Sequence, residues 1–193
     1  HVAYCILGVG AVGMAIKMSP AELPLDARAL ALQGVILQMF AHGLAAAGLF
    51  YMVGMLEERT GKRGLTDFGG LSKATPRFAA AFYILTFCSL GLPFLAGFAA
   101  EFLIFSGSFA VAAPETVLAT VGLLATAVFL LTMLQRIFTG PTPERLQSLP
   151  DLNLRETFVL IPILIFVFWA GISPGTFLNL SNLAVEQLTQ LAP

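Results

Sequence analysis

The sequence contains 193 residues, of which 58% are hydrophobic and 11% are charged, whereas an ordinary soluble domain carries about 25% charged residues. Its ten Lys and Arg and eleven Asp and Glu give a formal net charge of −1, and its mean hydropathy is +0.87. So few charges cannot cover the surface of a water-soluble domain, and the lack of a basic excess argues against a nucleic-acid partner. The composition therefore indicates an integral membrane protein.

Long runs without charged residues divide the chain into helical segments. Because about 20 apolar residues cross a bilayer as a helix, we expect six spans. They are residues 1–18 (incomplete), 29–56, 77–92, 95–112, 116–138 and 157–173, followed by a C-terminal tail, residues 174–193. The runs are rich in Leu, Ala, Phe and Val and lack the polar–apolar alternation of barrel strands. The expected fold is an all-α, polytopic transmembrane helical bundle.

The beginning of the chain and its connecting segments say little about topology. The chain shows neither an initiator Met nor a signal-peptide pattern, and we interpret it as part of a longer protein. With six spans, five Lys and Arg fall on each side of the membrane. The positive-inside rule therefore gives no orientation.

Glycines recur in the first two spans, as they do in closely packed membrane helices. They are Gly8, Gly10, Gly13, Gly34, Gly43 and Gly48. The first three also match G-x-G-x-x-G, the dinucleotide-binding fingerprint. That fingerprint needs the strand-to-helix turn of a βαβ unit, which a membrane-type run does not provide, so we interpret these glycines as packing residues.

Glu101 is the one charged residue between Arg77 and Glu115. A charge near the bilayer centre costs about 2.5–3.5 kcal/mol on insertion scales, so such a carboxylate is kept for a function or paired with a cation. A movable charged partner would set its proton affinity, which favours a role in proton translocation. The alternatives are a permanent ion pair or a residue near a helix end that reaches the membrane surface, since Glu101 follows Pro93 by eight residues.

His42 is the second candidate for proton translocation. It follows Gln38 by one helical turn, so the two side chains project from one face. Imidazole titrates in the physiological range and can donate and accept hydrogen bonds at once, with Gln38 as polar support. A neutral His that only hydrogen-bonds to another helix is an equally good interpretation. The neighbouring Gly43 allows a close backbone approach or a local helix break.

Pro93, with Gly91 and Gly97 on either side, interrupts the apolar stretch before Glu101. Such an interruption frees backbone groups that protein or water must satisfy. One interpretation is a polar pocket beside Glu101, with Pro93 and Gly97 supporting the break. The other, which the segment lengths favour, is an ordinary turn between two spans.

Patterns for a metal, a cofactor or a nucleophile are missing around these residues. His1 and His42 have no Cys or carboxylate at ligand spacing, and the two cysteines, Cys5 and Cys88, cannot form a four-ligand site. A Ser, His and Asp set cannot be assembled either. We expect no catalytic residue, bound cofactor or metal on this chain.

Several stretches are similar to signatures of one family. Residues 32–44 (LQGVILQMFAHGL) are similar to a QGAxxQMxAHGL stretch, and residues 89–102 to the signature LGLPGxxGFxGEF. Residues 58–60 (ERT), 67–71 (DFGGL) and 153–156 (NLRE) and Pro174 also fit. On these residues the chain resembles the M-type antiporter-like subunits of respiratory complex I, the proton-pumping NADH:quinone oxidoreductase.

The resemblance implies a fold and a role. It describes this chain as the second inverted repeat of an antiporter-like subunit plus a final helix. It places Glu101 at the terminal proton-exchange position and His42 on the hydrated polar axis of the family. It also implies that FMN, iron–sulfur clusters, NADH and quinone bind to other subunits. The expected partners are the other membrane subunits of complex I, including the L- and N-type subunits, with the lipid bilayer and protons, in the bacterial inner membrane.

Two other functions are compatible with the residues. One is a subunit of a multisubunit Na⁺/H⁺ antiporter or membrane-bound hydrogenase, which shares this ancestry. The other is a purely structural membrane subunit in which Glu101 is permanently paired. The expected function is proton translocation as a subunit of the oxidoreductase, without redox chemistry on this chain.

Overall fold

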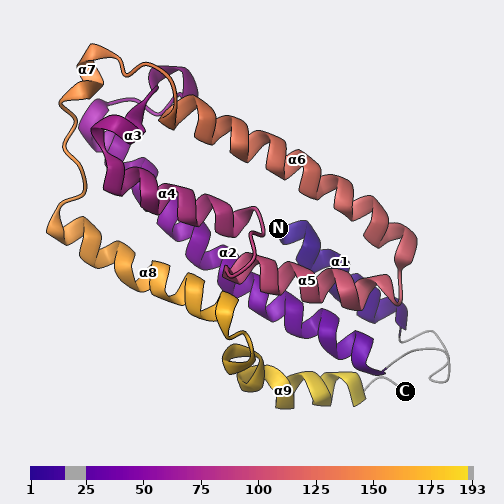
Figure 1. The fold of residues 1–193 in the computed structure, drawn as a ribbon. Helices are drawn as coiled ribbons and strands as arrows, with labels where there is room; N and C mark the ends of the chain where they lie inside the picture. Colours follow the sequence, from indigo (N-terminus) through magenta and orange to yellow (C-terminus); the bar gives the residue numbers. More distant parts are fainter. Residues whose placement is uncertain (16–24, 191–193) are drawn as a thin grey trace.

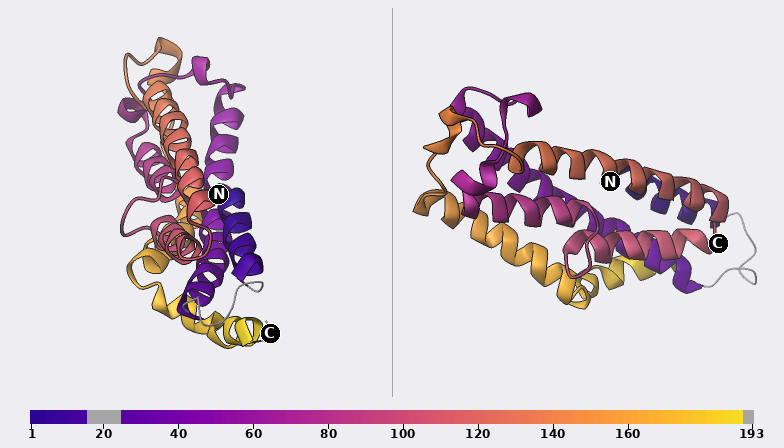
Figure 2. Two further views of the ribbon diagram at one scale, coloured as in Figure 1. Left: turned by 90° about the vertical axis from the view of Figure 1, so that its right-hand side faces the viewer. Right: turned by 45° about the horizontal axis from the view of Figure 1, so that its top comes forward.

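The structure, a computed structural model, describes residues 1–15 and 25–190, and every regular element in these ranges is a helix (Figure 1). The longer helices are α1 (Val2–Ala15), α2 (Leu25–Thr60), α4 (Pro76–Ser89), α5 (Ala96–Phe109), α6 (Ala113–Phe138), α8 (Leu154–Ile172) and α9 (Gly175–Gln190). Short elements lie in the connections: the 3₁₀ turn η2 (Leu65–Asp67), α3 (Leu71–Ala74) and α7 (Glu144–Gln147). The long helices from α1 to α8 run along a common axis (Figure 2). The all-α bundle predicted from the sequence is confirmed.

Within the described ranges, three helices, α2, α6 and α8, are long and apolar enough to cross a membrane, and α1 and α5 are shorter apolar helices. The helix α2 extends past the expected span 29–56 at both ends. Residues 16–18 of the first expected span and 191–193 of the expected tail lie outside the described residues. The remainder of that tail is mostly the helix α9, which packs on α2, where Gln33 Nε2 donates to Asn182 Oδ1 at 2.7 Å.

The helices α4 and α5 follow one another along a single face of α2. A Cβ built on Gly48 would meet Leu85 of α4, and one built on Gly34 would meet Ile104 of α5. An earlier residue of α2 thus contacts the later helix, α5, and a later residue of α2 contacts the earlier helix, α4. Both α4 and α5 therefore run antiparallel to α2. Figure 1 shows the two helices in sequence across the bundle.

This arrangement corrects the expectation of two separate spans at 77–92 and 95–112. Each helix has 14 residues, or about 21 Å, less than the roughly 30 Å of a hydrocarbon core. Together they match the length of α2. The expected ordinary turn is therefore an interruption inside one crossing, because both halves bury their apolar faces against the same partner helix.

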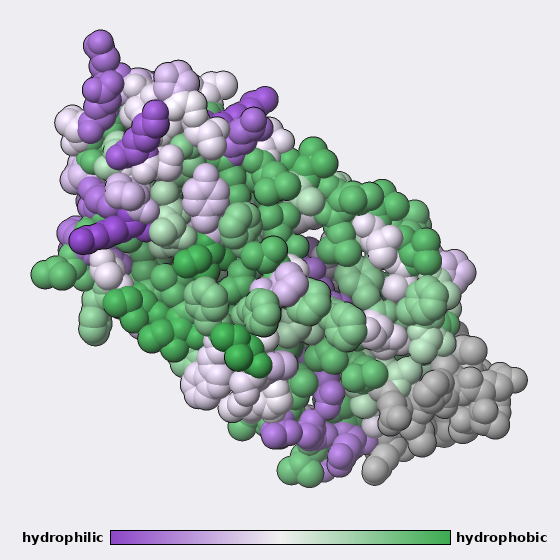
Figure 3. All heavy atoms as spheres, in the orientation of Figure 1, coloured by the Kyte–Doolittle hydropathy of each residue, from purple (hydrophilic) through white to green (hydrophobic). Residues whose placement is uncertain are grey.

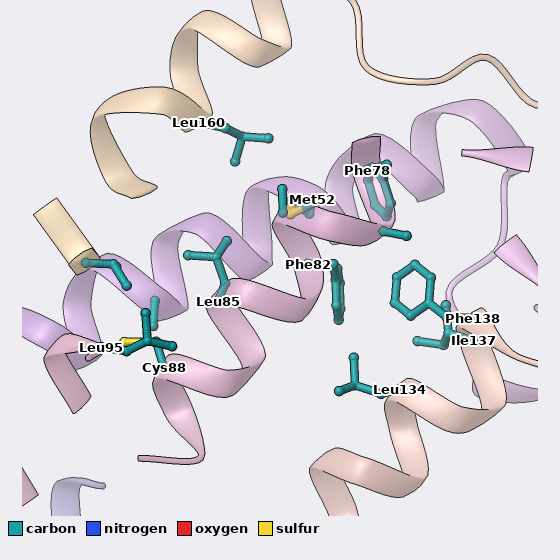
Figure 4. Packing of buried hydrophobic residues seen from close by; sticks show 14 of the residues in the cluster. Met52, Phe78, Phe82, Leu85, Cys88, Leu95, Leu134, Ile137, Phe138 and Leu160 are labelled. Atoms are coloured by element: carbon teal, nitrogen blue, oxygen red, sulfur yellow. The ribbon is translucent and has the colours of Figure 1, made fainter. Parts of the chain in front are cut away.

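A cluster of aromatic rings holds the end of α6 against α4 (Figure 4). Phe82 of α4 lies 5.1 Å from Phe138 and 6.0 Å from Phe78, measured between ring centroids. Phe78, Phe82 and Phe138 are all fully buried. The middle of α6 makes little contact with the bundle, and it exposes Val117, Leu118, Val121, Leu124, Val128 and Phe129. An exposed apolar face of this length is compatible with lipid or with another membrane helix.

The polar end of the bundle is formed by the connections around α3 and α7, where hydrophilic residues gather (Figure 3). Here Arg59 of α2 pairs with Glu156 of α8 at 2.6 Å. Glu156 also accepts from Asn153 N, while Asn153 Oδ1 accepts from Glu156 N, which completes a capping box at the start of α8. The pair therefore fixes the beginning of α8 to the end of α2.

Asp151 caps α4 from this connection. The N-cap residue Thr75 makes no capping bond, and its hydroxyl donates instead to Leu71 O at 3.0 Å. Asp151 Oδ2 accepts from Arg77 N and Oδ1 accepts from Phe78 N, both at 2.9 Å. Partial burial raises the pKa of Asp151, but these bonds, a further N–H from the next residue and the Arg77 charge outweigh it and hold the pKa below its usual range.

We expect Asp151→Ala to lower the free energy of unfolding by about 1 kcal/mol, the usual contribution of a helix cap. Because the pKa of Asp151 is lower in the folded protein than its ordinary 3.8, this stabilisation is complete above that pH. It is lost as the pH falls through the folded pKa. Thermal unfolding of the purified complex checks this: the Tm difference between wild type and variant is constant near neutrality and shrinks below about pH 3.8.

Glu144→Ala is the matched control, since Glu144 is an exposed acid in the same region. It is expected to leave the Tm unchanged at every pH. A Tm difference for Asp151→Ala that widens on acidification contradicts the capping role.

Candidate functional site

Glu101 lies in the second turn of α5, immediately after the interruption. It is buried, with 5% of its surface exposed, and its atom Oε1 has no hydrogen-bond partner among the described residues. Its other oxygen, Oε2, faces the interruption, because a Cβ built on Gly91 would lie 2.6 Å from it. Gly91 has φ of 69°, which also favours glycine. The loop between α4 and α5 therefore covers the carboxyl group at Oε2, while Oε1, which accepts no hydrogen bond from the described residues, can bind a proton.

His1 is the titratable side chain that contacts this carboxyl group. Its Nε2 lies 3.4 Å from Glu101 Oε1 and 2.7 Å from Ser89 O, the last residue of α4. Because a carbonyl oxygen only accepts, Nε2 carries a hydrogen atom. A small shift of the ring would transfer this hydrogen bond from the Ser89 carbonyl to the Glu101 carboxylate. His1 therefore lies between the C-terminal end of α4 and the carboxyl group of Glu101.

His42 lies beside His1 at the centre of α2. The two imidazole rings have centroids 5.1 Å apart and an interplanar angle of 31°. Tyr4 also packs edge-on against His1, with 5.8 Å between the ring centroids. Glu101, His1 and His42 thus form a row of titratable groups at the level of the interruption. Figure 1 shows the first residue of the chain at mid-length of the bundle, next to the junction of α4 and α5.

Other buried polar atoms near this level also have no partner in the described part of the chain. They are Gln38 Oε1 of α2 and Thr86 Oγ1 of α4. Gly34 of α2 lies against Ile104 of α5, and the two helices are antiparallel. Gln38, one turn after Gly34, is therefore level with Ala100, which lies one turn before Ile104 and next to Glu101. Buried groups without partners are rare in proteins and usually mark water, an ion or a functional role.

The residues expected to support the break differ in what they do. Pro93 lies in the exposed loop between the halves, as expected. Gly97 lies against Cys88 O, so a side chain there would collide with the end of α4. Gly43 is different: α2 is continuous through it, and a Cβ there would meet nothing within 4 Å. The close approach or helix break expected at Gly43 is therefore wrong, because this residue faces open space.

Of the glycines that were expected to pack closely, some lie against a neighbouring helix and others face open space. Side chains at Gly8, Gly34 and Gly48 would meet neighbouring helices at 2.6 Å, whereas Gly10 and Gly13 face open space. Close packing thus holds α1, α2 and α5 together around Ile104.

Sequence reasoning missed His1. Nothing in local spacing joins it to Glu101, which lies 100 positions later, and it was considered only as a metal ligand. The signal that could have found it is similar to the one that identified His42: an imidazole adjoining an apolar run. Among residues 1–15 and 25–190, no group of three His, Cys, Asp or Glu is placed to hold a metal ion.

The chain is similar to membrane proteins of one known family. The family described as "NADH:quinone oxidoreductase/Mrp antiporter, TM" matches residues 24–128. NADH-quinone oxidoreductase subunit M of Escherichia coli K12 is 36% identical over 163 residues, which cover 83% of this chain and 32% of that protein. NADH-ubiquinone oxidoreductase chain 4 of Arabidopsis thaliana is 36% identical over 158 residues, or 81% of this chain and 32% of the relative.

A solved structure shows the same arrangement of helices. A chain in the structure of respiratory complex I from Thermus thermophilus with bound NADH matches with a TM-score of 0.85 at 26% identity. The match covers 98% of this chain and 37% of that chain. The chain therefore spans about a third of the length of the curated relatives it matches.

Proposed function

Because this chain belongs to the NADH:quinone oxidoreductase/Mrp antiporter family of membrane proteins, we propose that it forms part of the proton-translocating M-type subunit of a respiratory complex I. The relatives named subunit M and chain 4 support this assignment, as does the likeness to a chain of complex I. In this proposal the chain moves protons, and quinone reduction elsewhere in the complex supplies the energy.

The observation that carries the proposal is a buried acid with one unpartnered oxygen at an interrupted helix. Glu101 Oε1 can accept a proton without breaking a hydrogen bond, and His1 is near enough to deliver one. The contact between His1 and Glu101 is long, at 3.4 Å, whereas Arg59 donates to both carboxylate oxygens of Glu156 at 2.7 and 2.6 Å. The difference between the two acids favours an exchanging role for Glu101.

The row of groups supports proton transfer by short steps. A proton on His1 moves to Glu101 when the ring turns from Ser89 O toward the carboxylate, and His42 reloads His1 from α2. Moving one full charge across 100 mV costs about 2.3 kcal/mol. Two unit charges 4 Å apart interact by about 4 kcal/mol at an effective dielectric constant of about 20. A rearrangement at the α4–α5 loop that changes the distance between His1 and Glu101 can therefore supply a change of this size.

The remaining parts of the proposal concern what surrounds the chain. FMN, iron–sulfur clusters, NADH and quinone are assigned to other subunits. The partners are other membrane subunits of the complex, with the L- and N-type subunits as neighbours, and the location is the bacterial inner membrane. The exposed apolar face of α6 provides a surface for such neighbours or for lipid.

A second candidate is a subunit of a multisubunit cation/proton antiporter, since the family description includes the Mrp antiporters. The two functions differ in what drives transport. Proton pumping that depends on NADH and is independent of Na⁺ supports the first, whereas Na⁺-dependent exchange without NADH supports the second.

We expect His1→Gln to lower proton pumping about tenfold. The amide can still donate to Ser89 O, so the local geometry is kept, but it cannot take up a proton. The loss is smaller than the 10²–10⁴-fold of a positioned acid–base group because water can replace one link. The measurement is proton uptake per NADH oxidised, in proteoliposomes that contain the whole complex.

Tyr4→Phe is the control, because it keeps the ring against His1 and removes only a hydroxyl. It is expected to pump normally. If His1→Gln pumps as well as the control, then His1 is only a packing residue.

A further inference from the structure

An apolar groove of about 990 Å³ runs between α4 and α8 on the outside of the bundle. The groove takes no part in the Glu101 site. Its floor is made of aliphatic side chains from both helices, which include Ala80, Ala81, Ile84, Leu160, Ile161 and Leu164. Figure 1 shows α4 and α8 side by side, with their N-terminal ends toward the polar end of the bundle.

Two arginines stand at the polar end of this groove. Arg77 lies in the first turn of α4 and Arg155 in the first turn of α8, and both are exposed and line the groove. Neither forms an ion pair with any residue that the structure describes; the pairs found there involve Glu101, Glu156 and Glu57.

Two of the three nearby acids make other interactions. Asp151 attracts Arg77, but its two oxygens accept backbone N–H groups at the start of α4. Glu156 is held by Arg59 and by its own capping box. Glu58 lines a neighbouring hollow together with Arg155, without an ion pair between them. Among the residues that the structure describes, Arg77 and Arg155 are therefore not held in an ion pair, and both guanidinium groups can bind an anion at the mouth of the groove.

The groove also lies at a level in the membrane that suits a bound lipid. The helix α8 has 19 residues, or about 28 Å, which is close to the thickness of the hydrocarbon core. Its first turn lies at the polar end, where the capping box and the two arginines mark the membrane surface. Below them, exposed Phe158 and Ile165 continue the apolar face of α8.

We propose that this groove binds one anionic phospholipid, with its phosphate between Arg77 and Arg155 and an acyl chain along α4 and α8. Arginine is suited to this role because its guanidinium group binds phosphate oxygens in a bidentate manner. The apolar floor matches the acyl chain, and unpaired charge at one end distinguishes an anionic headgroup from a neutral one. The inference needs only a membrane location and does not depend on proton transfer at Glu101.

The test uses the intact complex in nanodiscs that contain phosphatidylglycerol with a photoactivatable group in the acyl chain. We expect crosslinks to the peptides that carry Ala80–Ile84 and Leu160–Leu164, and few with the matching phosphatidylcholine probe. The double variant Arg77→Gln/Arg155→Gln weakens phosphatidylglycerol labelling about 30-fold, since each basic residue near an anionic surface contributes about a 5-fold preference.

Matched controls separate charge from shape. Arg63→Gln/Arg136→Gln removes two exposed arginines from the same end of the bundle and leaves labelling unchanged. Ala80→Trp fills the groove without changing charge and abolishes labelling, whereas Leu118→Trp on the exposed face of α6 does not. Equal labelling by the two lipids, or a transmembrane helix of another subunit lying in the groove in a structure of the complex, overturns the proposal.

Discussion

Glu101→Gln is expected to lower proton translocation through this subunit about 100-fold, the lower range for loss of a positioned acid–base group. Glutamine has nearly the same shape and fits beside Gly91, so the helices keep their packing and the complex assembles. The amide cannot bind and release a proton, so the row that begins at His42 and His1 has no acceptor. The measurement is the number of protons moved per NADH oxidised in proteoliposomes.

The control for this variant is Glu115→Gln. Glu115 is an exposed acid in the first turn of α6, outside the row of titratable groups. It is expected to pump at the wild-type stoichiometry. Normal stoichiometry in Glu101→Gln removes Glu101 from the mechanism, and loss of assembly in that variant instead supports the purely structural alternative.

Gly34→Val is expected to destabilise the protein by about 3 kcal/mol, because it overpacks the interface between α2 and α5. A Cβ at Gly34 would lie 2.6 Å from Ile104 N and 2.9 Å from Leu103 Cβ. Backbone atoms cannot move aside as a flexible side chain can, so the two helices must separate. We expect a lower Tm of the purified complex and less assembled subunit in the membrane.

Gly54→Val tests whether the loss comes from the interface. Gly54 lies in the same helix, and a Cβ there would meet nothing within 4 Å. Its change in stability is expected to stay within about 0.5 kcal/mol. Equal losses of stability in the two variants are incompatible with close packing at Gly34.

The sequence was sufficient to predict the helices but not how two of them combine. The residues around Pro93 predicted an interruption, and the structure has one between Ser89 and Ala96. Hydropathy over 77–112 is compatible with two short spans or with one interrupted crossing, because it counts apolar residues without showing what they pack against. The deciding fact is tertiary: Leu85 and Ile104 contact the same face of α2.

The candidate site shows the same limit. Glu101 could be singled out because it is a lone charge in an apolar run, and this signal is local. The position of His1 beside it depends on how α1 lies against α5, which spacing rules for a single helix do not reach. Gly43 shows the opposite error, since a glycine beside a candidate residue suggested a backbone role although it faces open space.

Difference infrared spectroscopy of the complex, between the resting and the NADH-reduced states, tests the central claim most directly. We expect wild type to show a carboxylic-acid carbonyl band that changes during turnover, because Glu101 binds and releases a proton. The band is expected to disappear in Glu101→Gln and to persist in Glu115→Gln. An identical spectrum in wild type and Glu101→Gln would contradict proton exchange at this residue.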